Sequence, residues 1–129
     1  MYSSLIKIII LLVVSGPLWG IHASAHELTP TYPKLEQSYI PNVLQTKVKI
    51  WNARVDVNHY KLEVTDAFWN DVPFIADQKL FKLDYMERRE IEIFLPSDTT
   101  AQYICTRSML QKGAQSRSMI SSKVCSKIR

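Results

Sequence analysis

Two cysteines, Cys105 and Cys125, are the side chains best suited to covalent chemistry, and the 129-residue sequence has no other cysteine. If they face each other on antiparallel strands, Arg107 opposes Lys123, and the turn falls on residues 113–117, a short loop that begins with glycine. The hairpin register and a disulfide therefore agree. We expect the two cysteines to pair in an exported chain, and the alternative is two unpaired buried thiols.

Histidines offer a second kind of chemistry. Removal of a signal peptide after Ala25 would make His26 the first residue, so that its α-amine and its imidazole could chelate one metal ion, with His59 as a third nitrogen ligand. Nitrogen ligands in tetragonal geometry suit Cu(II). This set resembles the histidine brace of lytic polysaccharide monooxygenases and of some periplasmic copper-binding proteins. The alternative is a terminal histidine and a loop histidine that hold no metal.

Other catalytic chemistries find little support in the sequence. Glycine motifs that bind phosphate are absent. A Ser-His-Asp or Cys-His site needs a histidine poised as a base, whereas the chain after residue 25 has only His26 and His59. A closed zinc site needs more cysteines and histidines than remain. We therefore predict a non-enzymatic protein without a cofactor, with copper as the alternative.

Charge is distributed unevenly along the chain. The formal net charge is +4, yet residues 99–129 contain six basic and no acidic residues. We predict a partner surface that combines basic residues of the last hairpin with an aromatic turn: Lys112, Arg117, Lys123, Lys127, Arg129, Phe68 and Trp69. It fits another protein or an anionic component of the cell envelope; nucleic acid is not expected. The alternatives are a solvated β-face and aromatics that close one end of the core.

The first 25 residues have the parts of a secretory signal peptide. Lys7 precedes an apolar run over residues 8–14, and Ala23-Ser24-Ala25 forms an A-x-A cleavage site. The run is far shorter than the ~20 residues that span a bilayer, and no later stretch is apolar enough to do so. We therefore predict a periplasmic or extracellular protein, with residues 1–25 as the signal peptide and residues 26–129 as one domain.

Alternating apolar and polar side chains predict strands over residues 44–52, 60–65 and 90–95. Further strands are predicted at 72–75, 78–83, 102–108 and 119–127. Residues 26–41 contain three prolines, which fit an edge segment or an extended tail, and residues 84–89 fit a helical turn or a hairpin loop. About seven short strands and no long helix predict an all-β, antiparallel Greek-key sandwich.

Ala101, Tyr103 and Cys105 resemble the tyrosine corner of immunoglobulin-like domains, in which a tyrosine stands two residues before a strand cysteine. In antibody-type domains the partner cysteine lies upstream, whereas here it is Cys125. The resemblance therefore implies an Ig-like sandwich in which the disulfide joins the last two strands.

The motif order is also similar to the N-terminal Ig-like domain of periplasmic pilus chaperones: a strand ending in asparagine (VKIWN), a strand and Asp turn (KLEVTD), and a strand-loop-strand run (KLFKLDYMERREIEIFL). Those chaperones donate apolar residues of their last strand to a subunit. Here Ile120, Val124 and Ile128 would share one face, interrupted by Ser122 and Ser126. The chain also resembles uncharacterised exported proteins of marine bacteria and phages. We infer a binding or assembly module of the cell envelope or of a virion.

Overall fold

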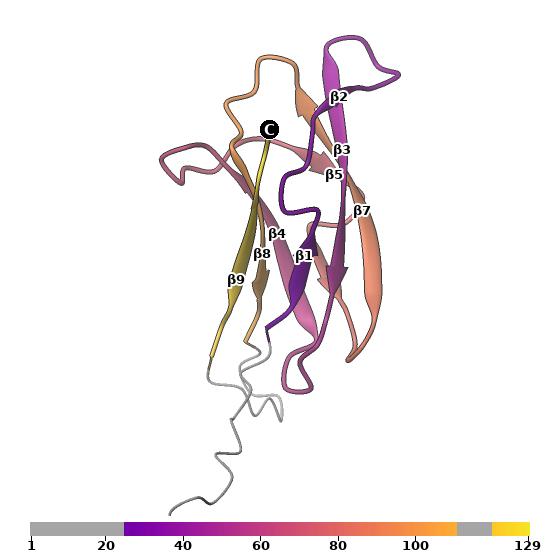
Figure 1. The fold of residues 1–129 in the computed structure, drawn as a ribbon, viewed down its shortest axis with the longest axis vertical. Coiled ribbons are helices and arrows are strands. Elements are labelled where there is room, and N and C mark those ends of the chain that lie inside the picture. The colour runs from indigo at the N-terminus through magenta and orange to yellow at the C-terminus, as the bar shows by residue number, and fades with distance from the viewer. Residues whose placement is uncertain (1–24, 111–119) are drawn as a thin grey trace, which may run out of the picture.

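The computed structural model describes residues 25–110 and 120–129. The predicted signal peptide up to Ser24 and the tip of the last hairpin, with Lys112 and Arg117, lie outside the described residues. Over the described part the backbone forms nine strands and no helix (Figure 1). The strands are β1 Glu27–Thr29, β2 Glu36–Gln37, β3 Val43–Trp51, β4 His59–Thr65, β5 Ile75–Ala76, β6 Leu80–Lys82, β7 Arg88–Pro96, β8 Tyr103–Ser108 and β9 Lys123–Lys127. Within these residues no helix could cross a membrane.

The strands form two antiparallel sheets. Sheet A has the order β1-β3-β7-β5, with β2 also paired to β3, and sheet B has the order β6-β4-β8-β9. These orders match the A-B-E-D and C-F-G sheets of constant-type immunoglobulin domains, with β6 added beside β4. The predicted all-β, Ig-like Greek-key sandwich is therefore confirmed.

Alternation along the long strands explains how the two sheets pack. In β3, Val48 and Ile50 are fully buried, while the intervening Lys49 is exposed and forms an ion pair with Glu90 of β7. Val48 pairs with Ile91 of β7 in the sheet register, so apolar residues of both strands enter the same layer. The core between the sheets consists of Leu28, Val48, Ile50, Val57, Tyr60, Leu62, Val64, Val72, Phe81, Leu83, Ile91, Ile93, Leu95, Ala101 and Ile104.

The proline-rich segment after residue 26 contacts both sheets. Strand β1 pairs with β3 in sheet A. A few residues later, the carbonyls of Thr31 and Pro33 accept hydrogen bonds from the backbone N–H groups of Lys127 and Arg129, each at 3.0 Å. Strand β1 also contacts β9 of sheet B. The sequence allowed either an edge segment or an extended tail here, and the pairing of β1 with β3 makes the region an edge segment.

The final hairpin has the predicted register. Cys105 pairs with Cys125 and Arg107 pairs with Lys123 across β8 and β9. The two cysteines form a disulfide, with their Cα atoms 4.1 Å apart. The disulfide therefore joins neighbouring strands of sheet B, as predicted, whereas the antibody-type bond joins the two sheets.

Three shorter predictions needed adjustment. The strand expected at 72–75 is β5, which pairs only over Ile75–Ala76, because Pro73 cannot donate a backbone hydrogen bond. The last strand begins at Lys123 among the described residues, whereas Met119, where it was expected to begin, lies outside them. Residues 84–87 form the turn that leads from β6 to β7, in which the backbone N–H of Asp84 donates to the carboxylate of Glu87 at 2.8 Å, whereas Arg88 and Arg89 already belong to β7.

Candidate functional site

The loop at residues 66–70 is shaped by one carboxylate. Asp66 accepts hydrogen bonds from the backbone N–H groups of Phe68 at 2.8 Å and Asn70 at 3.0 Å, and these bonds lower the pKa of Asp66. A bridge between Thr65 and Asp71 closes the base of the loop. Within it Trp69 has a φ of 66°, a region that bulky residues avoid. The loop therefore holds Trp69 in a strained backbone conformation.

Trp69 packs against the outer face of sheet B. Its ring stacks on the ring of Tyr103, with centroids 4.5 Å apart and an interplanar angle of 13°. The ammonium of Lys123 lies 5.3 Å from the centre of the indole. Trp69 is nevertheless 55% exposed, and the neighbouring Phe68 is 83% exposed. The aromatic turn therefore does not close the core; it displays two aromatic side chains to solvent.

The basic residues beside Trp69 are arranged around a single carboxylate. Glu63 of β4 lies 3.4 Å from Arg107 and 3.5 Å from both Lys61 and Lys123. Burial raises the pKa of Glu63, but the charge of Arg107 and then those of Lys123 and Lys61 outweigh this effect and leave the pKa below its ordinary value. Glu63 therefore stays ionised. The ammonium of Lys123 lies close both to the carboxylate of Glu63 and to the indole of Trp69.

We call the group Phe68, Trp69, Tyr103, Arg107 and Lys123 the aromatic–basic patch. It unites predicted surface residues from the loop after β4 with one from β9, far apart in the sequence. Tyr103 and Arg107 were not predicted as surface residues, although their alternation with buried residues of β8 was a readable signal.

Lys127, another predicted basic residue, lies beside the patch, because it is exposed and pairs directly with Tyr103 across β8 and β9. Arg129 lies beyond the end of β9, with its guanidinium 4.2 Å from the ring centre of Tyr32. Lys112 and Arg117 fall outside the described residues.

His26 lies inside the sandwich. Its Nε2 is 2.8 Å from the hydroxyl and 3.1 Å from the carbonyl oxygen of Thr106, and its Nδ1 is 3.1 Å from the hydroxyl of Ser122. The carbonyl can only accept, so we assign the proton to Nε2. The side chain is 2% exposed, and burial, followed by the charge of Arg54, lowers the pKa of His26.

His59 faces away from His26. The ring of His26 packs on Tyr60, with centroids 4.8 Å apart. His59 precedes Tyr60 on β4, so its side chain leaves the opposite face of the sheet. There its Nδ1 lies 2.8 Å from the amide oxygen of Asn58. The structure does not bring the two histidines together, and residues 25–110 and 120–129 contain no group of three or more His, Cys, Asp or Glu residues that could hold a metal. The copper site stays a prediction.

A buried polar network surrounds His26. Arg54 is bound by both oxygens of Asp56, at 2.9 and 2.7 Å, and also donates to the hydroxyl of Ser122 at 3.2 Å. The hydroxyl of Tyr60 donates to the side-chain oxygen of Asn52 at 2.6 Å, and burial raises the pKa of Tyr60 to about 12. The bonds of Arg54 fix the loop between β3 and β4 against Ser122, the residue that precedes β9. No periodic pattern in the sequence marks this network, because its members come from loops as well as from the strands β4 and β8.

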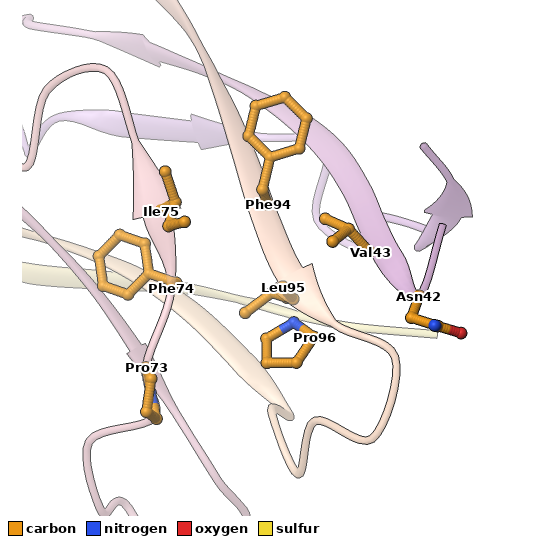
Figure 2. Close-up of a pocket in the computed structure, with 8 residues that line it drawn as sticks. All are labelled: Asn42, Val43, Pro73, Phe74, Ile75, Phe94, Leu95 and Pro96. Carbon is orange, nitrogen blue, oxygen red and sulfur yellow. The ribbon is translucent and has the colours of Figure 1, made fainter. Parts of the chain in front are cut away.

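An apolar pocket of about 310 Å³ lies on the other sheet, at the edge strand β5 (Figure 2). It is lined by Asn42, Val43, Pro73, Phe74, Ile75, Phe94, Leu95 and Pro96. Next to it, a polar pocket shares Phe94 and is otherwise lined by Lys47, Asp77, Glu90 and Glu92. Sequence reasoning missed the apolar pocket. Its signal was Phe94, an aromatic residue among the outward-facing positions of β7.

No protein-family model matches this sequence, and no curated protein matches it. Solved structures do match the fold. The chain is similar to the E. coli chaperone DraB, with a TM-score of 0.58 and 15% identity over 81% of this chain and 53% of that chain. It is also similar to a chain in the complex of the Salmonella enterica SafA pilin with the SafB chaperone, with a TM-score of 0.60 and 13% identity over 81% and 52%.

A third similar structure is the ASH/PapD-like domain 7 of human CEP192, with a TM-score of 0.53 and 10% identity over 88% of this chain and 91% of that one. The chain spans about half the length of the two bacterial chains. These likenesses support the resemblance to pilus chaperones inferred from the sequence and show that this chain has a PapD-like, immunoglobulin-like fold.

Proposed function

We propose that this chain is an exported, non-enzymatic module that binds a protein partner through the aromatic–basic patch during assembly of a cell envelope or a virion. One observation carries the proposal: Trp69 is held at a φ of 66°, stacked on Tyr103 beside Lys123, and remains 55% exposed. Residues held in strained backbone conformations cluster at functional sites. The similar SafB chaperone, described in complex with a pilin, supports a protein as the partner.

The patch fits this role better than the last strand does. Val124 and Ile128 are partly buried and pack against the core of this chain. The side chains that alternate with them are the polar Lys123 and Lys127 and the disulfide-bonded Cys125. The apolar positions of β9 are thus already used within the fold, so donation of apolar residues from this strand, which the chaperone resemblance implied, is not the mode that we propose.

Binding at the patch should combine an apolar and an ionic component. Aromatic and arginine side chains dominate the energetics of protein interfaces, and Phe68 and Trp69 offer such anchors. Arg107 and Lys123 flank them, so an acidic partner surface would be attracted, and the association rate would fall as salt is added.

A crosslinking experiment tests the proposal. A photo-reactive phenylalanine analogue is placed at position 68 or, as a control, at position 39, because Phe68 and Tyr39 are equally exposed at 83% and 84%. We expect a defined protein adduct in producing cells from position 68 only. The adduct should weaken when Lys123→Glu is added. Equal adducts from both positions, or none from position 68, would overturn the proposal.

A further inference from the structure

One end of the sandwich displays apolar side chains to solvent. Residues 52–58 join β3 to β4 at this end, residues 84–87 lie between β6 and β7, and the residues that follow β8 and precede β9 lie there as well (Figure 1). We call the exposed apolar residues of these segments the apolar end: Val55, Tyr85, Met86, Leu110 and Ile120. We propose that the apolar end docks onto a lipid bilayer and places these side chains at the boundary between headgroups and acyl chains. This contact is separate from the aromatic–basic patch and goes beyond the proposed function.

Hydrogen bonds join these segments to one another. The backbone N–H of Met86 donates to the carbonyl of Asn52 at 2.7 Å, and the backbone N–H of Asn52 donates to the carbonyl of Glu87 at 3.0 Å. These bonds hold Met86 at a φ of 64°, a region that residues with a Cβ atom avoid. The guanidinium of Arg54 donates to the carbonyl of Ile120 at 3.0 Å. The apolar side chains are therefore held in place before any contact forms, which lowers the entropy lost on binding.

Several backbone donors at the apolar end are bonded within the chain. The backbone N–H groups of Arg54, Met86, Glu87 and Met109 all donate to acceptors of this protein. A backbone N–H without a partner is costly to remove from water, and a bilayer supplies no partner below its headgroups. These turns can therefore approach the acyl chains with little loss of hydrogen bonding.

The carboxylates of these turns are paired. Each carboxylate in residues 52–58 and 84–87 lies at most 3.4 Å from a basic side chain, and the pairs are Arg54–Asp56, Lys82–Asp84 and Arg89–Glu87. Residues 109–110 and 120–122 carry no charged side chain. In these described segments no isolated carboxylate would be brought to the bilayer, and the pairs leave no net charge. Apolar contact, and not attraction to anionic lipids, should therefore drive the binding.

Aromatic and basic side chains lie directly behind the apolar end. Trp51, the last residue of β3, pairs with Arg88, the first residue of β7, and the guanidinium of Arg88 lies 5.3 Å from the centre of the indole. Lys82 ends β6 and is exposed. Tryptophan prefers the membrane–water interface, and Lys and Arg keep their charged groups in water while their stems pass along apolar surface. Apolar tips followed by Trp, Arg and Lys reproduce the order from acyl chains to headgroups.

The first strand also begins at this end. Glu27, the first residue of β1, pairs with Trp51, and Ala25 precedes it. The signal peptide predicted for residues 1–25 would therefore join the domain here and hold this end towards the membrane during export. The aromatic side chains of the patch come from the other end of β4, because Phe68 and Trp69 follow its last residue. A docked domain would leave them open to a protein partner.

Flotation of the purified protein, starting at His26, with phosphatidylcholine vesicles tests the contact. We expect the protein to float with the vesicles to the same extent at low and at high salt, because the contact is apolar. Val55→Asn and Met86→Asn should each lower the partition coefficient about tenfold. Asparagine adds no charge and tolerates the left-handed backbone at position 86. The matched control Tyr39→Asn, at an exposed position before the far end of β3, should float like the wild type.

Quenching by lipid measures the orientation of the docked protein. After residue 25 the sequence contains two tryptophans, Trp51 and Trp69. Vesicles of brominated phosphatidylcholine should quench Trp51 in the Trp69→Phe variant and leave Trp69 in the Trp51→Phe variant unquenched.

Four results would overturn the inference. The protein does not float, it is quenched at Trp69 and not at Trp51, or the Val55→Asn and Met86→Asn variants float like the wild type. In the fourth, flotation requires anionic lipid and is lost in salt, which would assign the membrane contact to basic residues. A photo-crosslinker at position 55 that captures a protein in cells, without flotation, would assign this end to a protein partner instead.

Discussion

The ring of Trp69 stacks on the ring of Tyr103 at 4.5 Å, although the two residues belong to separate segments of the chain. This contact, with the hydrogen bonds to Asp66, holds Trp69 at a φ of 66°. A side chain attached at Cβ is disfavoured there, whereas glycine is not. At Trp69 the backbone strain therefore destabilises the folded state, whereas the ring stacking stabilises it.

The backbone strain can be measured by comparing two truncations. Trp69→Gly and Trp69→Ala both remove the stacking, but only glycine relieves the strain. We expect the glycine variant to have the larger free energy of unfolding in urea, by about 1 kcal/mol. At Phe68, which lacks a positive φ, the alanine variant should be more stable than the glycine variant. An alanine variant that is the more stable at both positions would contradict this interpretation.

The disulfide should supply a large share of the stability. Cys105 and Cys125 are separated by 20 positions. Closing such a loop stabilises a protein by about 3 kcal/mol in the chain-entropy model. We expect a reductant to lower the urea midpoint of the wild type by a corresponding amount. The double variant with Cys105→Ser and Cys125→Ser should start from the lower midpoint and not respond to reductant; an unchanged midpoint would show that the bond adds little.

The hydroxyl of Tyr60 should stabilise the buried network. Tyr60→Phe leaves the side-chain oxygen of Asn52 with the backbone N–H of Arg54 as its remaining donor, at 2.8 Å. We expect a loss of about 1 kcal/mol in unfolding free energy, while Tyr39→Phe, at a position that is 84% exposed, should change nothing.

Tyr60 also predicts a response to alkaline pH. Its pKa is raised from 10.0 to about 12 in the folded protein, so the unfolded chain loses this proton first. Its contribution is complete below pH 10 and is lost as the pH rises through 12. The difference in stability between the wild type and Tyr60→Phe should therefore shrink across this window; a constant difference would argue against the raised pKa.

The stability that His26 contributes should depend on pH in the opposite direction, and should fall as the solution becomes acidic. Its folded-state pKa is below 6.5, so the unfolded chain binds this proton more readily. The contribution of His26 is therefore complete above pH 6.5 and is lost as the pH falls below that value, towards the folded-state pKa. His26→Gln should flatten the slope of unfolding free energy against pH in this range. An unchanged slope would assign the acid sensitivity to other groups.

A copper titration tests the alternative hypothesis that His26 and His59 bind copper. Both ring nitrogens of His26 are hydrogen-bonded inside the sandwich, and His59 lies on the other face of β4. We expect Cu(II) to bind the processed protein weakly, without an axial nitrogen signal in electron paramagnetic resonance. A tight site that is lost in His26→Ala would instead establish the histidine brace.

The sequence alone predicted the strands whose residues alternate and the pairing of the two cysteines. Val48 and Ile50 in β3, and Ile91 and Ile93 in β7, carry a period of two that local side-chain direction imposes. The register of Cys105 with Cys125 followed from counting along one hairpin. Both are local properties, because each depends on residues within one strand or one short hairpin.

Only the tertiary structure determined which residues from distant parts of the sequence contact one another. Trp69 finds Tyr103 and Lys123 because the loop after β4 folds back over sheet B. His26 and His59 separate because β4 lies between their side chains. The pocket forms where the short β5 meets Phe94 at the edge of sheet A. These contacts depend on strand order and loop path, which Greek-key crossovers set over long sequence separations that no local pattern records.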